Sequence, residues 1–433
     1  MLRTRPPALA ACVLTVALGT SCAQSANQLP SRPAAPAADP SPHAGPALER
    51  PSSAPTGRAK TAPRAAGNPA GLNDQQMVGQ LFVSYVYGST ATSATQAQRA
   101  ANIALYGVPT GAEVITRWHL GGVILVDHNN LDPSRPQLST GNVTNATQIS
   151  ALTAGLQQAA AQADSKVPLL IGTDQEGGRV QRITSGVVRR PAQQQLASLS
   201  PAALRCSYFT LGRDLRALGI NQDYAPDADV VTTASGVIGD RSFGPNPAQD
   251  AADVVQAVAG LQHAGVLATL KHWPGHGSTT TDSHAALAVI DESAAQWQAT
   301  DRRPFLAAAS TAAAVMVGHL ALPSIDPSGQ PATLSPSLVN GQLRHHLGYQ
   351  GLTITDSLYM QPMQAAGPPG QVALRALAAG NDMLLETPDL PHAEQAILEA
   401  ISSSRASRKV VTTALTRILT AKRKATTTPS AHC

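Results

Sequence analysis

Short apolar runs recur along the chain from about residue 76, and each is followed by polar residues and then by an alanine-rich stretch. Short apolar runs bounded by turn residues are typical of buried strands, and here their starts lie roughly 30 to 50 residues apart, the length of a strand–helix unit. We expect eight strands, at residues 81–85, 122–126, 167–171, 220–226, 266–270, 313–317, 352–355 and 383–385.

The stretches between these runs carry helix signals. Alanine, leucine and glutamine recur at helical spacing over residues 148–163, 201–218, 247–264, 371–379 and 390–403. Pro201 and Pro247 follow a serine and an asparagine, which are favoured helix caps, and Gly219, Gly265 and Gly380 stand where helices should end. Eight such units predict a single (β/α)8 barrel of the α/β class, with a doubly wound open sheet as the alternative. The longer segment 88–112 could be a flap or a surface excursion.

The N-terminal residues have a different pattern. Arg3 and Arg5 precede an apolar stretch at 8–18, which predicts an export signal too short to span a membrane. Cys22 follows Leu-Gly-Thr-Ser, which resembles the lipobox of bacterial lipoproteins; ordinary cleavage and free secretion is the alternative. We expect a signal peptide over 1–22, a disordered Pro/Ala/Ser-rich tether over 23–70, a globular domain over 71–425 and a flexible tail over 426–433.

The distribution of charge argues against one class of partner, and two cysteines raise the question of a disulfide. The net charge is +4, but seven of the 31 basic and only two of the 27 acidic residues lie in the first 70 positions, so the globular part is close to neutral. It therefore lacks the basic surplus expected of a nucleic-acid-binding protein. The basic cluster 422–424 is interpreted as a helix end. Cys206 and Cys433 could form a disulfide in an oxidising compartment, and the sequence leaves this open.

Polar clusters follow five of the predicted strands, at 173–182, 223–244, 271–284, 318–319 and 355–357. The carboxyl ends of barrel strands meet on one face, so these clusters predict a shared cleft there. The cluster at 271–284 holds three histidines, a lysine and an aspartate, and Pro274 with Gly275 and Gly277 predicts a shaped loop after a strand that ends at Leu270. Zinc binding by these histidines would favour a helix, which the proline and glycines prevent, so no metal is expected.

The residues of that loop also carry a resemblance. Lys-His-Trp-Pro-Gly-His-Gly at 271–277, followed by Asp-Ser-His at 282–284, resembles a signature of family 3 glycoside hydrolases, in the β-N-acetylglucosaminidase branch. Segments 174–182, 239–244, 355–360 and 379–383 are similar to four further motifs of that family. The resemblance covers about residues 73 to 420 and implies one barrel, no metal and no organic cofactor.

Carried over position by position, the resemblance implies roles for eight residues. Asp356 would be the nucleophile, His284 the general acid/base and Asp282 the carboxylate that orients His284. The sugar would be held by Asp174, Arg182, Arg241, Lys271 and His272. A carboxylate nucleophile and a proton donor are what retaining glycoside hydrolysis requires, and histidine ionises near neutral pH.

These residues predict an exported, lipid-anchored, monomeric exo-β-N-acetylglucosaminidase, active on peptidoglycan fragments in cell-wall turnover. One alternative is another exo-glycosidase of the family, such as a β-glucosidase, although that branch takes its acid/base from elsewhere. A second is an inactive, sugar-binding surface lipoprotein. Phosphate in place of water as the final acceptor is also chemically reasonable. Trp273, Ser278 and the segment 128–130 depart from the family pattern, which bears on the loop and the leaving group rather than on the reaction.

Overall fold

Eight parallel strands form the centre of the fold in the computed structural model, which describes residues 70–129, 134–232 and 236–433. Their order in the sheet is β11-β9-β7-β6-β3-β2-β1-β12. A parallel bridge between Ile354 and Met383 joins the two ends of this order, so the sheet closes into a barrel. The strands are β1 (Phe82–Ser84), β2 (Gly122–Ile124), β3 (Leu170–Thr173), β6 (Gln222–Asp223), β7 (Leu267–Trp273), β9 (Ala314–Val317), β11 (Leu352–Thr355) and β12 (Leu384–Leu385).

Each strand overlaps one of the predicted apolar runs. The closure of the sheet confirms the predicted barrel and excludes the open sheet. The prediction that the fifth strand ends at Leu270 is wrong, because β7 continues to Trp273. Trp273 pairs in register with Val317 of β9 and is fully buried, with its ring 5.7 Å from that of Trp297 and 5.2 Å from that of Phe305. Its indole N–H donates to the Leu338 carbonyl, so a tryptophan is fully satisfied here.

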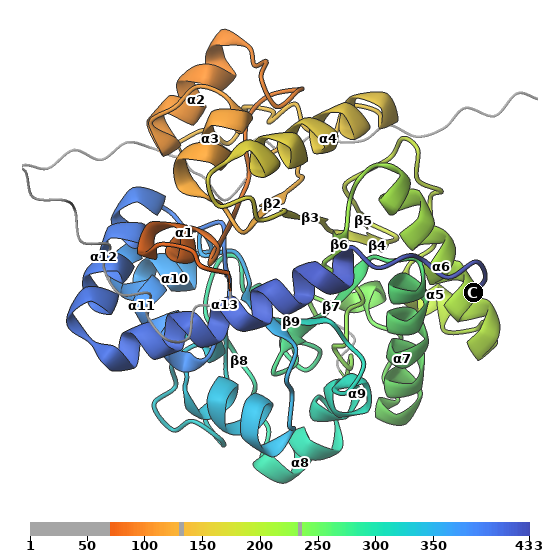
Figure 1. The fold of residues 1–433 in the computed structure, drawn as a ribbon. Coiled ribbons are helices and arrows are strands. Elements are labelled where there is room, and N and C mark those ends of the chain that lie inside the picture. Colours follow the sequence, from red (N-terminus) through yellow and green to blue (C-terminus); the bar gives the residue numbers. More distant parts are fainter. Residues whose placement is uncertain (1–69, 130–133, 233–235) are drawn as a thin grey trace, which may run out of the picture. The chain divides into compact units, whose positions relative to one another are not determined.

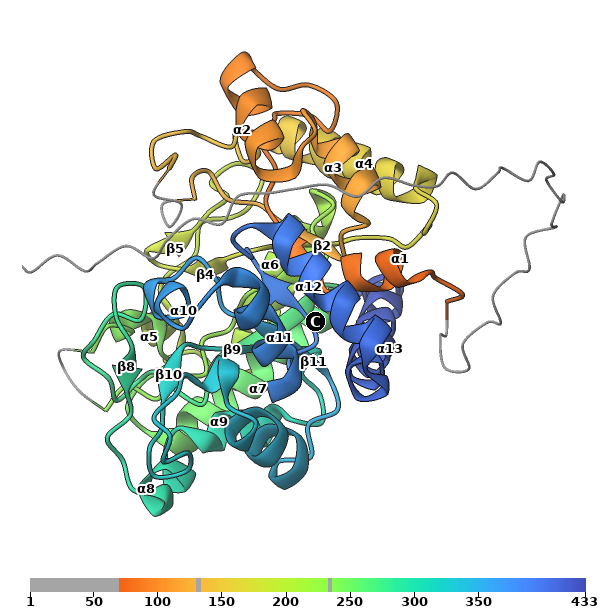
Figure 2. The same ribbon diagram turned by 90° about the vertical axis from the view of Figure 1, so that its left-hand side faces the viewer.

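Helices surround the barrel, as Figure 1 and Figure 2 show. They are α1 (Asp74–Gly79), α2 (Gln96–Tyr106), α3 (Gly111–Trp118), α4 (Ala146–Gln162), α5 (Gln193–Leu196), α6 (Pro201–Ala217), α7 (Pro247–His263), α8 (Ala294–Ala299), α9 (Arg302–Ala308), α10 (Gln361–Ala365), α11 (Pro369–Ala379), α12 (Leu390–Ser403) and α13 (Arg405–Ala425). Ser337–His346 is a π-helix. Two small sheets, β4 (Gln175–Gly177) with β5 (Val180–Gln181) and β8 (Ala288–Val289) with β10 (Leu320–Ala321), follow the ends of barrel strands.

The start and stop signals in the sequence act as expected. The Ser200 hydroxyl accepts from the backbone N–H of Ala203 at the start of α6, and the Asn246 side chain accepts from Ala248 N at the start of α7. Gly219 and Gly265 follow α6 and α7 with φ of 80° and 79°. That left-handed conformation is open to glycine at little cost, so both helices end there.

The segment 88–112 contains helix, which its composition did not predict. Helix α2 lies within it and α3 begins near its end. Buried polar side chains hold it in place: Asn102 Nδ2 donates to the carbonyls of Tyr87 and Pro109, and Gln98 Nε2 donates to the carbonyl of Thr140. Because these interior positions are polar, the apolar periodicity that marks a buried helix is weak.

Helix α13 lies at the end of the barrel where the strands begin. Arg417 reaches Asp382, just before β12, and Lys422 donates to Gln80, just before β1. In Figure 2 this helix lies on the right, whereas the small sheets β4–β5 and β8–β10 lie on the left. The predicted helix end at 422–424 is confirmed as the last turn of α13. The opposite end of the barrel is therefore free to form a site.

The C-terminal residues, expected to form a flexible tail, are attached to the barrel's helices. Cys206 on α6 and Cys433 form a disulfide, which answers the question that the sequence left open. Arg205 Nε also donates to the carbonyl of Cys433, and Ser430 N donates to the carbonyl of His263 on α7. The tail thus ties the chain's end to two neighbouring helices.

The predicted signal peptide, Cys22 and the tether as far as residue 69 lie outside the described residues. Within residues 70–129, 134–232 and 236–433, every helix is too short or too polar to cross a bilayer.

Candidate active site

A pocket opens where the barrel strands end, and it encloses about 240 Å³. Seven of the eight residues predicted from the resemblance line it, and the eighth, Asp282, hydrogen-bonds one of them. The predicted cleft at the carboxyl ends of the strands is therefore confirmed. The lining comprises Ile124, Val126, His128, Asn129, Asp174, Glu176, Val180, Arg182, Arg241, Lys271, His272, His284, Met316, Asp356, Ser357, Leu385 and Glu386.

A buried ion network forms one wall of the pocket. Lys271 Nζ lies 2.8 Å from Asp174 Oδ1 and 2.6 Å from Glu176 Oε1. Arg241 Nε lies 2.7 Å from Glu176 Oε2 and 2.9 Å from Asp227 Oδ2. Glu176, whose side chain is 1% exposed, thus joins the two cations. Burial by itself raises the pKa of Glu176, but Arg241 and Lys271 outweigh burial and hold that pKa well below its ordinary value.

Four of the five predicted sugar-binding residues take part in these ion pairs, and their side chains differ in exposure. The side chains of Lys271 and Arg241 are 3% and 14% exposed, and their charges are already paired. Arg182 lies 3.8 Å from Asp174, and its side chain is 48% exposed. Arg182 therefore presents the most polar surface to a ligand, while Lys271 and Arg241 hold Asp174 and Glu176 in position.

His272 is held by a buried aspartate. Its Nδ1 lies 2.8 Å from Asp229 Oδ2, and the backbone N–H groups of His272 and His276 donate to Asp229 Oδ1 at 3.0 and 2.7 Å. Burial raises the pKa of Asp229, but His272 and these donors lower it to about 2. Asp229 is thus ionised, and its carboxylate fixes the turn after β7 through these hydrogen bonds. Gly277 lies in the same turn, where a side chain would collide with the Val230 backbone.

Asp356 stands directly after β11, and its backbone N–H donates to the carbonyl of Val317. Its Oδ1 accepts from Ser357 N at 2.7 Å. Burial raises the pKa of Asp356, but His272, His319 and His284 together outweigh burial and leave that pKa below its ordinary value. The carboxylate is therefore ionised at neutral pH, as a nucleophile must be.

His319 positions the segment that carries Asp356. The ring is fully buried, and burial lowers its pKa. Its Nε2 lies 2.8 Å from the Ser357 carbonyl, which can only accept, so Nε2 carries the proton. Nδ1 contacts the Thr333 hydroxyl at 2.7 Å.

His284 and Asp282 form a pair on the loop over the pocket. His284 Nδ1 lies 2.7 Å from Asp282 Oδ1, which also accepts from the backbone N–H of His284. With Nδ1 engaged, Nε2 is the nitrogen left for proton exchange with a ligand. The His284 carbonyl accepts from Gln361 N, at the start of α10, which links the loop to the segment after β11. The His284 side chain is nevertheless 55% exposed.

Metal binding has limited support among the described residues. The three histidines of the loop hydrogen-bond different partners: His272 contacts Asp229, His284 contacts Asp282, and His276 Nε2 contacts Ser283. The group of ligand atoms that does cluster comes from Asp227, Asp229 and His272, within 4.8 Å of one another. These atoms already interact with Arg241, with one another and with backbone N–H groups.

Several residues of the site were not assigned roles from the sequence, among them Glu176, Asp229, His319 and Glu386. Glu176 lies inside the quoted 174–182 segment, and Asp229 and His319 follow predicted strands, so position gave a signal for these three. Glu386 directly follows the predicted strand 383–385, so the same positional signal was present, but no role was assigned to it.

Comparisons with known proteins agree with this geometry. A family model described as the glycosyl hydrolase family 3 N-terminal domain matches residues 106–421. Beta-hexosaminidase A of Pseudoalteromonas piscicida is 33% identical over 347 residues, which are 73% of this chain and 55% of that protein. A beta-hexosaminidase of Idiomarina loihiensis is 36% identical over 265 residues, which are 60% of this chain and 78% of that protein.

A solved structure is also similar. It is a glycoside hydrolase family 3 β-N-acetylglucosaminidase from Paenibacillus sp. strain FPU-7, with a TM-score of 0.72 and 34% identity over 82% of this chain. The matched part is 63% of the Paenibacillus protein's chain. This protein therefore spans only 55% and 63% of the lengths of the Pseudoalteromonas and Paenibacillus relatives. Since the family model covers well over half of its residues, the protein belongs to glycosyl hydrolase family 3.

Proposed function

We propose that this protein is a retaining exo-β-N-acetylglucosaminidase that removes terminal β-linked N-acetylglucosamine from peptidoglycan fragments. One observation carries the proposal: an ionised carboxylate, Asp356, and a carboxylate-oriented histidine, His284, belong to the same pocket. A nucleophile and a proton donor at one site are the two groups that retaining hydrolysis requires. The names of the similar proteins, beta-hexosaminidase and β-N-acetylglucosaminidase, support this choice of sugar.

In the proposed mechanism, Asp356 attacks the anomeric carbon and forms a glycosyl-enzyme. His284 Nε2 gives its proton to the departing oxygen and then takes a proton from the water that releases the sugar. Asp282 at 2.7 Å from Nδ1 fixes the orientation of the ring and leaves Nε2 toward the ligand, as carboxylates do beside other catalytic histidines. The exposed position of His284 suits a group that must meet both the leaving group and water.

Asp174 and Arg182 would bind sugar hydroxyls directly, with Lys271, Arg241 and His272 completing the same subsite. Charged donors and acceptors bind hydroxyls more directionally than apolar contacts do. A pocket of about 240 Å³ lies below the range of roughly 300–1,000 Å³ common for ligand sites, which favours one terminal sugar over an internal chain segment.

We further propose that the protein acts outside the cytoplasm in cell-wall turnover, lipid-anchored at Cys22. The basic and apolar pattern of residues 3–18 and the lipobox-like residues before Cys22 support export. The Cys206–Cys433 disulfide supports an oxidising compartment. Activity found only in the cytosolic fraction of the native cells would contradict this part.

The test is release of chromophore from an aryl β-N-acetylglucosaminide and from the matching β-glucoside, with the Asp356→Asn variant as the matched control. We expect turnover of the acetamido substrate alone, reduced at least about a thousandfold in the variant, because a carboxamide cannot act as the nucleophile. Preferred turnover of the glucoside would indicate another exo-glycosidase. Binding of N-acetylglucosamine in calorimetry without any turnover would indicate an inactive sugar-binding lipoprotein.

A further inference from the structure

Glu386 enters the pocket from β12, on the side between the Asp356 strand and β1. Its backbone N–H donates to the Val83 carbonyl at 2.8 Å, and the preceding carbonyl, of Leu385, accepts from Leu358 N at 2.9 Å. These two hydrogen bonds fix Glu386 at the same rim as the Asp356–Ser357 segment. Its φ is 48°, in the left-handed region that residues with a side chain rarely adopt. Such strain is found most often at functional sites.

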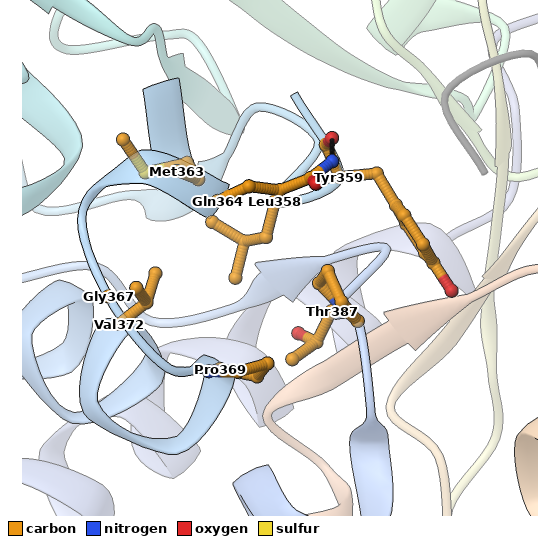
Figure 3. A pocket seen from close by; sticks show the side chains of 9 residues that line it. Leu358, Tyr359, Met363, Gln364, Gly367, Pro369, Val372 and Thr387 are labelled. Atoms are coloured by element: carbon orange, nitrogen blue, oxygen red, sulfur yellow. Dashed lines mark hydrogen bonds between the residues drawn. The ribbon is translucent and has the colours of Figure 1, made fainter. Parts of the chain in front are cut away.

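The surroundings of Glu386 leave one polar direction for its side chain. Glu386 is 6% exposed and lines the pocket together with Asp356, Asp174 and Arg182. The Ser357 side chain lowers its pKa, and Ser357 lines the same pocket. On the other side, Leu358 and Thr387 face an apolar cavity of about 350 Å³ that Met363 and Val372 also line, shown in Figure 3. The carboxyl group therefore belongs to the sugar pocket.

The chemical state of Glu386 differs from that of its neighbours. Burial first, and then the charges of Asp174 and Asp356, raise the pKa of Glu386 to about 7, against the lowering effects of Ser357 and Arg182. A neutral carboxylic acid both donates and accepts hydrogen bonds, whereas an ionised carboxylate such as Asp356 only accepts.

We propose that Glu386 is a further substrate-binding residue, which hydrogen-bonds a hydroxyl or the acetamido group on the edge of the sugar ring that faces β12. This inference rests on the proposed function, because it takes the bound group to be a sugar with its anomeric carbon at Asp356. The ring edge facing β7 is left to Lys271 and His272. Glu386 thus helps to determine which substituents the sugar can carry.

The experiment compares Glu386→Met and Glu386→Gln in the full chain. Methionine keeps the length but makes no comparable hydrogen bond, so we expect kcat/KM for the aryl β-N-acetylglucosaminide to fall about tenfold or more. Glutamine keeps one donor and one acceptor, so at pH 6 it should stay within about threefold of the wild type. Glu394→Gln is the control, because Glu394 is buried on α12, outside the pocket lining, and should change nothing.

Substrate analogues then identify the partner group. The wild type and Glu386→Met are assayed on the 3-deoxy, 4-deoxy and 6-deoxy glycosides and on the unacetylated glucosaminide. For one analogue, we expect the wild type to show a kcat/KM about tenfold below that for the parent glycoside. Glu386→Met should show almost the same kcat/KM for that analogue and the parent, because the two changes remove the same hydrogen bond. An unchanged kcat/KM for Glu386→Met would overturn the proposal. An equal loss of kcat/KM on every analogue would also overturn it, because such a loss indicates a purely structural role.

The same comparison in calorimetry, with free N-acetylglucosamine as the probe, separates the two proposals. If the wild type does not hydrolyse the glycosides but binds the sugar, weaker binding by Glu386→Met still supports the contact while the proposed function fails. If the wild type hydrolyses them and Glu386→Met binds and reacts normally, only the role of Glu386 fails. Absence of both turnover and binding in the wild type would overturn both.

Discussion

Replacing Glu176 with glutamine tests whether the buried ion network holds the pocket together. The change keeps the shape of the side chain but removes the carboxylate that joins Lys271 at 2.6 Å to Arg241 at 2.7 Å. Lys271 would retain its contact with Asp174, and Arg241 would retain its contact with Asp227. Each of the two buried cations would therefore lose one of its two carboxylate partners.

The expected cost follows from burial. The side chains of Glu176, Lys271 and Arg241 are 1%, 3% and 14% exposed, so water can replace little of the lost interaction. Removing one partner of a buried ion pair costs about 3–5 kcal/mol. The control is Asp74→Asn, which removes a bidentate pair with Arg408 whose side chains are 45% and 31% exposed, and pairs of that kind contribute about 0–1 kcal/mol.

The assay is urea unfolding of both variants at pH 7 and at lower pH. Because the folded-state pKa of Glu176 is depressed, its stabilising contribution is complete above the unfolded value of about 4.3 and is lost as the pH falls toward the folded value. The difference between wild type and Glu176→Gln should therefore shrink below about pH 4. A loss no greater than that of Asp74→Asn at pH 7 would refute the view that Glu176 links the two cations energetically.

Three further outcomes are expected. Asp282→Asn should lower kcat by roughly 10²–10⁴ on a disaccharide and by less on an aryl glycoside with a good leaving group, because proton donation by His284 matters less there; equal losses on both would contradict the dyad. Reducing the Cys206–Cys433 disulfide should lower the free energy of unfolding by about 2–5 kcal/mol, and Cys206→Ser should become insensitive to dithiothreitol; equal stability with and without reductant would contradict this. Phosphate buffer should leave free N-acetylglucosamine as the product, and sugar 1-phosphate would instead indicate phosphorolysis.

The barrel could be predicted from local patterns alone. Strands of a parallel barrel are buried on both faces, so each one leaves a short apolar run, and these runs recur with the period of a strand–helix unit. The starts and ends of α6 and α7 could also be predicted from local sequence. Their signals, Pro201, Pro247, Gly219 and Gly265, act through their own backbone geometry. Once the barrel is inferred, residues near the carboxyl ends of the strands must converge, and Asp174, Lys271 and Asp356 do line one pocket.

Other features depended on partners far away in the sequence. Glu176 joins Lys271 and Arg241 only because β4, β7 and the turn at Gly239–Arg241 meet in space. Strand β7 continues to Trp273 because β9 pairs with it and Trp297 and Phe305 cover its ring, and none of these adjoins it in the chain. Glu386 lies just beyond the 379–383 segment, and only the fold brings it beside Asp356, Asp174 and Arg182 in the pocket.

Local sequence therefore specified the barrel strands, the caps of α6 and α7 and the end of the barrel that carries the chemistry, because each depends on neighbours within a few residues or on the periodicity of burial. The tertiary structure alone decided which charges pair and which carboxyl groups ionise. Asp229 is ionised, whereas the pKa of Glu386 lies near neutral pH, because pKa values respond to burial and to charges brought close by folding. Neither burial nor these neighbouring charges can be read from the order of residues along the chain.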